Sequence, residues 1–328
     1  GGVTKEMWQS PDYNKAIEIF QAAIIRAEDS LNNKWKGQFL NILGSIYLNQ
    51  KDYDKALEYI NSALSIAKTI NDKSIIGTSL SLIGRVNSKQ NDYDTAIEYH
   101  QKALNLREKL GDKTTIANSL RAIGIIYEKG LYDFDKAEKY LNRSRQLYKE
   151  LGDERMISML NHLLSRLNDY AGNYDTAIEY SIKSYKIYLN LGEIIKSSII
   201  LRNIGEIYLY KGDYDQAVEY YKRAFDTVEQ SKKIGYKRQM GSSLWGIGNV
   251  YLYKGDLDTA LDYSERSLKI FEEIDFKHGM GASLNNIGLV YRKKGDNDKA
   301  VEYLEKSLTI KKEIGVFAAV TNGLAITE

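Results

Sequence analysis

Two segments that follow one another decide the fold: "LRNIGEIY", residues Leu201–Tyr208, and "GDYDQAVEYYKRA", residues Gly212–Ala224. In the first segment, Leu201, Ile204 and Tyr208 are three or four residues apart around Gly205, which puts them on one face of a helix. A glycine inside a helix costs about 1 kcal/mol relative to alanine, so we expect it where a neighbouring helix approaches closely. The second segment is amphipathic and carries the small residue Ala217, which suits the same contact. The two segments therefore predict a pair of packed helices.

The residues between the two helices are interpreted as a tight turn. Gly212 is typical of a left-handed helix end, Asp213 is typical of a helix N-cap, and Asp215 lies in the first turn, where the helix dipole favours an anion. Together with Glu219, these aspartates offer the alternative of a metal site. Calcium loops need oxygen ligands at spacings such as D-x-D-x-D-G, whereas here a helix containing Ala217 follows at once. The turn is therefore predicted to be structural.

The same two elements recur along the whole chain at an almost fixed spacing. Segments such as "LNILGSIY" (Leu40–Tyr47) and "LNNIGLVY" (Leu284–Tyr291) precede most of the recurring alanines by twelve residues. A fixed period of this length indicates a repeat architecture, and a single proline in 328 residues favours an all-helical chain. The alanines are 40, 40, 41, 40, 40, 43 and 40 residues apart, at Ala16, Ala56, Ala96, Ala137, Ala177, Ala217, Ala260 and Ala300.

These residues resemble the tetratricopeptide repeat (TPR) over nearly the whole chain. The sequence departs from the usual pattern in two ways: the closing proline is missing, and the period is about 40 residues instead of 34. Long repeats of this kind are similar to those of kinesin light chain, of cell-polarity adaptors and of the sensor arms of signalling ATPases. The resemblance implies an all-α, right-handed superhelical solenoid of antiparallel helix pairs, whose concave wall is built from the first helix (helix A) of each pair.

The period divides the chain into one array over residues 1–328. Both ends fall inside a repeat: the tail of a helix A near Val3–Gln9 and the start of another near Leu324–Glu328. We therefore expect this sequence to be a piece of a longer protein. The predicted boundaries are a partial repeat at 1–31, full repeats at 32–71, 72–112, 113–153, 154–193, 194–234, 235–275 and 276–315, and a truncated helix A at 316–328.

Composition and motifs exclude several classes of function. The net charge is +2, from 46 basic and 44 acidic side chains, which gives no general attraction to nucleic acid or anionic membrane. The chain has no cysteine, no apolar stretch of membrane-spanning length and no signal-peptide core, so a cytoplasmic location is expected. Nucleotide loops and hydrolase motifs are absent from the sequence, and its three histidines show no H-E-x-x-H pattern. We expect no catalytic activity, cofactor, metal or small-molecule substrate.

By resemblance, the fifth and ninth residues of each repeat line the concave groove, with the second, twelfth and thirteenth beside them. These positions place an arginine in each of four consecutive repeats, and arginine suits carboxylates. Aromatic residues follow further along and could anchor a ligand. The candidate partner-binding residues are Arg85, Arg121, His162, Arg166, Arg202, Tyr210, Trp245, Asn249, Tyr253 and Asn285.

A groove that neutralises its own charge is the alternative to this binding interpretation. Arg202 could pair with Glu206, Arg166 could pair with Asp169, and Glu128 lies near Arg121 in sequence.

Two places break the repeat pattern. The repeat that begins near Met159 replaces the helix A glycine by Ser165 and the tyrosine by Asn168, which indicates either a functional position or divergent drift. The basic stretch Ser231–Ser243 lies within the 43-residue interval between Ala217 and Ala260. It could form a small contact for phosphate or an acidic partner, but a longer loop without a role is favoured.

The sequence thus predicts a scaffold that binds a protein or peptide, possibly acidic, in its concave groove, as the recognition arm of a larger signalling or adaptor protein. The alternative is a structural spacer or oligomerisation module within a larger enzyme. Nucleic-acid binding is disfavoured because basic and aromatic residues are not interleaved in one patch.

Overall fold

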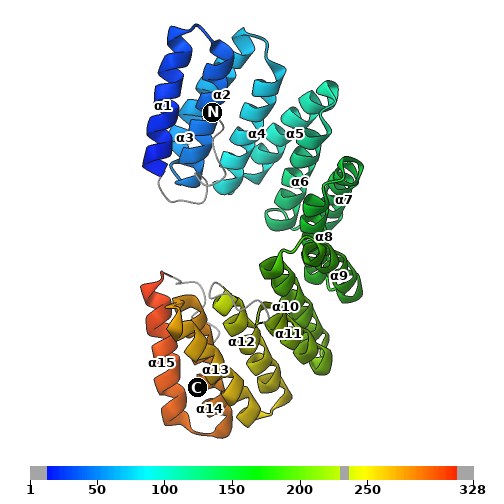
Figure 1. Ribbon diagram of the computed structural model, residues 1–328, viewed down its shortest axis with the longest axis vertical. Helices are drawn as coiled ribbons and strands as arrows, with labels where there is room; N and C mark the ends of the chain where they lie inside the picture. Colours follow the sequence, from blue (N-terminus) through cyan, green and yellow to red (C-terminus); the bar gives the residue numbers. More distant parts are fainter. Residues whose placement is uncertain (1–12, 230–235, 316–328) are drawn as a thin grey trace. The chain divides into compact units, whose positions relative to one another are not determined.

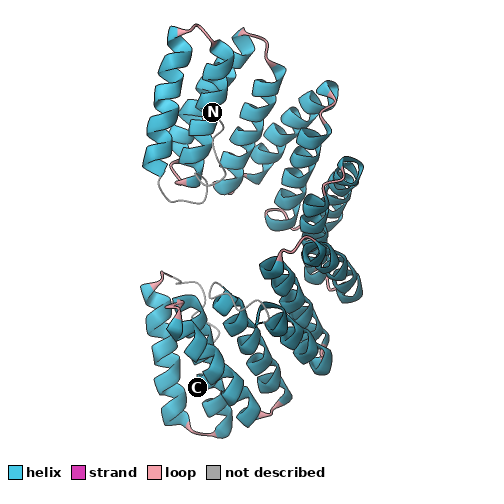
Figure 2. Cartoon of the chain, viewed as in Figure 1, coloured by secondary structure: helices cyan, strands magenta, loops and turns pink. Residues whose placement is uncertain are grey.

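The computed structural model describes residues 13–229 and 236–315, and every regular element in these ranges is an α-helix (Figures 1 and 2). The predicted partial helices at Val3–Gln9 and Leu324–Glu328 lie outside the described residues. The described helices are α1 Tyr13–Asp29, α2 Asn33–Asn49, α3 Tyr53–Thr69, α4 Lys73–Lys89, α5 Tyr93–Leu110, α6 Lys113–Lys129, α7 Phe134–Leu151, α8 Glu154–Tyr170, α9 Tyr174–Asn190, α10 Ile194–Lys211, α11 Tyr214–Glu229, α12 Lys237–Lys254, α13 Leu257–Glu273, α14 Lys277–Lys294 and α15 Asn297–Glu313.

The chain divides into two compact units, with unit 1 ending at Met156 and unit 2 beginning at Ile157. Within each unit, the helices that follow one another pack together, as α2 does with α3 and α12 with α13. An even-numbered helix also contacts the next even-numbered helix, as α10 does with α12 and α12 with α14. The even-numbered helices are the predicted A helices and the odd-numbered ones are the B helices. The chain is therefore an all-α solenoid of stacked antiparallel helix pairs, as predicted.

The glycine of helix A lies where helix B of the same pair crosses it. A Cβ atom at Gly124 would lie 2.8 Å from Leu141 Cγ, and one at Gly288 would lie 2.8 Å from Leu304 Cγ. The helices are so close that the bulky residue of helix B occupies the space of the missing side chain. The recurring alanine, exemplified by Ala217, is fully buried beside it. The predicted glycine–alanine contact is confirmed.

The turn between paired helices is also as predicted. Gly212 has a left-handed conformation with φ of +82°, which an L-residue rarely adopts. Asp213 Oδ1 accepts a hydrogen bond from the backbone N–H of Gln216 at 3.2 Å and so caps α11. Asp215 has a further role, since its Oδ1 lies 2.8 Å from Nζ of Lys254 in the following A helix. The aspartates of this turn are structural.

The basic stretch at Ser231–Ser243 is not a loop over its whole length. Residues 230–235 lie outside the described residues, but α12 begins at Lys237 and includes the rest of the stretch. The prediction of a loop was therefore wrong from Lys237 onward, because α12 begins eleven residues before Gly248, just as α10 begins eleven residues before Gly205. The first turn of α12 contains Arg238, which lines the cavity described next.

Candidate functional site: a basic and aromatic cavity in unit 2

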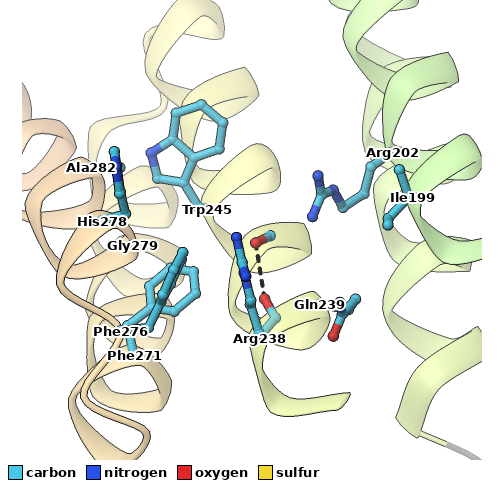
Figure 3. Close-up of a pocket in the computed structure, with 11 residues that line it drawn as sticks. Ile199, Arg202, Arg238, Gln239, Trp245, Phe271, Phe276, His278, Gly279 and Ala282 are labelled. Atoms are coloured by element: carbon cyan, nitrogen blue, oxygen red, sulfur yellow. Dashed lines mark hydrogen bonds between the residues drawn. The ribbon is translucent and has the colours of Figure 1, made fainter. Parts of the chain in front are cut away.

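Unit 2 contains a cavity of about 550 Å³ between its A helices α10, α12 and α14 (Figure 3). Helix α10 contributes Arg202, α12 contributes Arg238 and Trp245, and the end of α13 contributes Phe271. Such a volume suits a side chain or a short segment of a ligand. The lining residues are Ile199, Arg202, Arg238, Gln239, Ser242, Trp245, Phe271, Phe276, His278, Gly279 and Ala282.

The lining carries positive charge and no carboxylate. Arg202 extends from α10 toward Arg238 on α12, and His278 stands on the opposite side (Figure 3). Burial lowers the pKa of Arg202; Tyr221 and Glu206 partly oppose this effect, and the charge of Arg238 adds to it. Among the described residues, no carboxylate lies within 4 Å of Arg202 or Arg238. An anionic group of a ligand would therefore meet two guanidinium groups that are not yet neutralised.

Aromatic side chains form the apolar part of the cavity. The Phe271 ring is 2% exposed and occupies a slot that two glycines leave open: a Cβ at Gly241 would lie 2.7 Å from its Cε1, and one at Gly279 would lie 2.5 Å from its Cδ2. The guanidinium carbon of Arg238 lies 4.1 Å from the ring centre of Phe276, which is a close cation–π contact. This contact positions Arg238 beside the aromatic lining.

Two polar atoms of the lining are buried without a hydrogen-bond partner. They are the indole Nε1 of Trp245, a donor, and the Oε1 of Gln239, an acceptor. A buried polar group without a partner costs about 1–3 kcal/mol, so such groups are uncommon unless something satisfies them. A bound peptide backbone carries both an N–H and a C=O and would supply the two missing partners.

The structure brings together only some of the residues predicted from sequence. Arg202 and Trp245 line the cavity. Asn249 and Asn285 lie one turn further along α12 and α14, partly buried and outside its lining, and Tyr253 follows on α12 with its side chain exposed.

The remaining predicted residues lie away from the cavity. Tyr210 is exposed near the end of α10, and His162 and Arg166 are partly buried on α8 of unit 2. Arg85 and Arg121 belong to α4 and α6 of unit 1. The predicted arginines therefore divide between the two units.

Internal pairing, the alternative interpretation, does not hold for Arg202. The carboxylate of Glu206 instead accepts a hydrogen bond from the Tyr210 hydroxyl at 3.1 Å. Burial, followed by the charge of Glu206, raises the pKa of Tyr210 to about 12. Glu206 also acts on Arg202 through space, but the two do not form an ion pair.

Of the charged and aromatic residues that line the cavity, the predicted partner-binding residues omit Arg238, Phe271, Phe276 and His278, although Arg238 lies in the stretch Ser231–Ser243 that was considered for an anion contact. The family groove positions begin about one turn after Arg238, whereas α12 itself begins at Lys237. A signal was nevertheless present, since residues 238, 242, 245 and 249 follow the spacing of one helical face. Extending the groove stripe backward by one turn would have found Arg238, and likewise His278.

Stacked helix pairs whose A helices line a cavity define a helical-repeat scaffold, a class of protein that presents a surface to other molecules. A family model of the tetratricopeptide repeat matches residues 36–109, 75–150, 115–190, 155–230 and 239–313. A second model of the same repeat matches residues 202–273. The chain therefore belongs to the tetratricopeptide repeat family. The Sel1 repeat description matches residues 6–25. A comparison with the curated proteins finds no match.

Several solved structures share the fold. The apo form of RapI has a TM-score of 0.62 at 14% identity, covering 85% of this chain and 99% of RapI. A signal transduction ATPase with numerous domains from Pyrococcus horikoshii, which carries a tetratricopeptide repeat sensor, has a TM-score of 0.61 at 16% identity; the match covers 92% of this chain and 46% of that protein. A Rap protein complexed with competence and sporulation factor has a TM-score of 0.53 at 17% identity, covering 89% of this chain and 79% of that one.

The described residues contain neither a candidate membrane-spanning helix nor a candidate metal-binding cluster. None of their helices combines the length and the apolar character that crossing a membrane requires. The same residues contain no group of three or more His, Asp or Glu side chains placed to hold a metal ion.

Proposed function

We propose that this chain is a protein-interaction scaffold whose unit 2 cavity binds a peptide segment with a carboxylate next to a bulky apolar side chain. Arg202 and Arg238 hold the carboxylate, and the apolar side chain packs against Trp245 and Phe276. The ligand backbone pairs with the unpartnered groups of Trp245 and Gln239. The single observation that carries the proposal is a cavity with two arginines and no carboxylate among its lining residues.

The comparisons support the coarser part of this proposal. The family is generally one of scaffolds for protein contacts, and one related structure is a Rap protein complexed with competence and sporulation factor. The sensor of the Pyrococcus horikoshii ATPase suggests a setting: a non-enzymatic recognition arm of a larger cytoplasmic signalling protein. The repeat boundaries predicted from sequence are part of the same proposal.

The test is a selection from a displayed peptide library with the wild-type chain and with the Arg202→Gln/Arg238→Gln variant. The wild type is expected to enrich peptides that carry Asp or Glu beside a bulky apolar residue. Loss of two charge-assisted contacts should weaken a selected peptide by about tenfold or more, measured by fluorescence anisotropy. The helical circular dichroism signal should not change.

Arg223→Gln/Arg266→Gln is the matched control, because both arginines lie on B helices of unit 2, outside the cavity lining, and each forms an ion pair with an acidic residue one turn away. It is expected to select the same peptides as the wild type. Enrichment without acidic residues, or equal binding by the cavity variant, would contradict the proposal. Self-association at micromolar concentration that both variants retain would point instead to a spacer or oligomerisation module.

A further inference from the structure

The residue just before each helix A, its N-cap, changes in character along the chain. In unit 1 this residue has a polar side chain that accepts backbone N–H groups at the start of the helix. Asp72 Oδ1 accepts from Ser74 at 3.0 Å and from Ile75 at 3.1 Å, and Asp112 caps α6 in the same way. Phe276 occupies this position before α14 and provides no side-chain cap. A capping side chain stabilises the start of a helix, so the repeat of Phe276 lacks a favourable contact.

The ring of Phe276 contacts a cation and a second ring instead. The guanidinium carbon of Arg238 lies 4.1 Å from the ring centre of Phe276, which is well within the range of cation–π attraction. The Phe276 ring is tilted against that of Phe271, with the two ring centres 5.4 Å apart, and Phe271 is buried. The ring on which Arg238 rests is therefore itself supported by the core of unit 2 (Figure 3).

The equivalent pair of residues in unit 1 is a salt bridge. Lys34 has the place of Arg238, ten residues before the helix A glycine of its repeat. Asp72 has the place of Phe276, twelve residues before the glycine of the next repeat. Lys34 Nζ lies 3.5 Å from Asp72 Oδ2, so the two charges offset one another. An aromatic ring attracts a cation through its quadrupole but carries no net charge, so a ring in place of the carboxylate holds the cation and leaves its charge available.

Arg238 is not neutralised from elsewhere. Within the part of the chain that the structure describes, no carboxylate lies within 4 Å of its guanidinium group. Glu273, at the end of α13, pairs instead with Lys237 at 2.8 Å. An arginine on a flexible stem loses rotamer freedom when it binds a ligand. Contact with a supported ring reduces this loss, because the side chain is already held before the ligand arrives.

We propose that Phe276 is a positioning residue of the unit 2 cavity, whose ring holds the Arg238 guanidinium toward a ligand without neutralising it. The predicted effect on affinity rests on the proposed function, whereas the holding of Arg238 is observable without any ligand. The ring thereby helps the cavity to select an acidic ligand residue over its neutral amide counterpart, because that choice depends on an arginine whose charge is not already offset.

The first measurement uses the protein without a ligand. The NMR signal of the Arg238 Nε–H is compared between the wild type and Phe276→Leu, which keeps an apolar side chain but removes the ring. The ring current is expected to shift the wild-type signal upfield, and Phe276→Leu is expected to lose this shift and to exchange faster with water. Phe276→Tyr, the conservative variant, should retain the shift. An Arg238 signal that is the same in the wild type and in Phe276→Leu would overturn the positioning role, whether or not a peptide binds.

The second measurement compares a selected acidic peptide with the same peptide carrying Gln for Glu, or Asn for Asp, by fluorescence anisotropy. Phe276→Leu should bind the acidic peptide about threefold or more weakly and the neutral peptide as the wild type does. In the Arg238→Gln background, Phe276→Leu should have no further effect, because the ring acts through the arginine. Equal weakening of both peptides, or an undiminished effect without Arg238, would show that Phe276 acts through packing alone and would overturn the inference.

Phe276→Asp and Phe276→Asn form a matched pair. Both side chains suit the N-cap of α14, but only Asp can pair with Arg238 as Asp72 pairs with Lys34. Phe276→Asp should therefore bind the acidic peptide more weakly than Phe276→Asn does. Equal binding by these two variants would contradict the view that an acidic N-cap neutralises the arginine.

Tyr263→Leu is the control for loss of a ring. The Tyr263 ring centre lies 5.0 Å from the guanidinium carbon of Arg266 and 5.9 Å from the ring centre of Tyr251, outside the cavity lining. This variant should bind both peptides as the wild type does. A wild type that shows the upfield Arg238 signal but binds no acidic peptide would overturn the proposed function alone.

Discussion

Glycines in the A helices of unit 2 differ in what a side chain would meet. A Cβ at Gly246 would overlap the ring of Tyr221, with Cδ1 at 2.6 Å and Cζ at 2.7 Å. A Cβ at Gly281 would find its nearest neighbour, Ile310 Cγ2, at 3.6 Å, which is ordinary van der Waals contact. Both glycines are buried in helices, so the difference between them is one of packing and not of backbone conformation.

This difference predicts opposite effects for the same substitution. Gly281→Ala should stabilise the protein by up to about 1 kcal/mol, because alanine is the better helix former. Gly246→Ala should destabilise it by about 1–3 kcal/mol, because the buried Tyr221 ring has to move. Urea unfolding followed by circular dichroism measures both. Stabilisation by Gly246→Ala would show that the contact with Tyr221 relaxes freely.

At the scale of the helix pair, the departure at Ser165 has a structural explanation. Ser165 replaces the helix A glycine, and it faces Ser181 of α9, with which it shares a buried hydrogen bond at 2.6 Å. In most other pairs the residue at the position of Ser181 is large, as Leu141 is against Gly124, although Ser264 faces Gly248. A small residue on helix B therefore leaves room for a side chain on helix A. The sequence left open a functional position or divergent drift, and the compensating pair of serines fits divergent drift.

Neighbouring A helices of unit 2 also bring two carboxylates together. Asp169 of α8 has its Oδ1 buried without a hydrogen-bond partner. Burial, and then the charge of Glu206 on α10, raise its pKa from 3.8 to about 6. Because the folded-state pKa lies above the unfolded value, the folded protein binds the proton more tightly. This carboxylate therefore favours folding at low pH, and its contribution is lost as the pH rises from about 4 through 6.

Asp169→Asn should consequently stabilise the protein at pH 7.5 by about 1–2 kcal/mol, the value being discounted for partial exposure. At pH 4, where Asp169 is largely protonated in the folded state, the variant and the wild type should be nearly equal. Urea unfolding at the two pH values gives the difference. Glu206→Gln is the companion variant, since it removes the neighbouring charge and should reduce the pH dependence of the Asp169→Asn effect. A difference that is independent of pH would contradict the assignment.

The sequence predicted the elements better than the site. Gly212, Asp213 and Ala217 act locally or at a fixed spacing, so their roles follow from the repeat itself. Phe271 and Phe276 could not be assigned in the same way, because the cavity depends on which side chains separate helices bring together. Whether Arg202 pairs with Glu206 was equally undecided in the sequence, since it depends on rotamers and on the competing hydroxyl of Tyr210.

At the scale of the whole molecule, helices contact their neighbours in sequence or the next A helix within each unit. Stability in such an array is approximately a sum of local terms, so unfolding is not expected to be a single two-state transition. A substitution at Phe271 tests this additive description, because its buried ring contacts both α12 and α14.

Phe271→Ala should cost about 3–5 kcal/mol locally and weaken ligand binding in the unit 2 cavity. Hydrogen exchange measured by mass spectrometry should show faster exchange in α12, α13 and α14, while α2 to α5 of unit 1 keep their wild-type rates. The Lys254→Ala variant is the control, because it removes an exposed ion pair with Asp215, worth at most about 1 kcal/mol, and a long cation–π contact with Tyr251. Faster exchange throughout both units would contradict the additive description.

The ring of Tyr221 has a consequence for how such a chain can change over generations. It fills the space left by Gly205 in its own pair and by Gly246 in the following pair. A duplicated or transplanted pair placed after α11 would therefore be accepted only if it offered a glycine at the position of Gly246. The repeats look alike in sequence, yet each junction of this kind restricts which repeat can follow. The order of the repeats is therefore constrained during evolution.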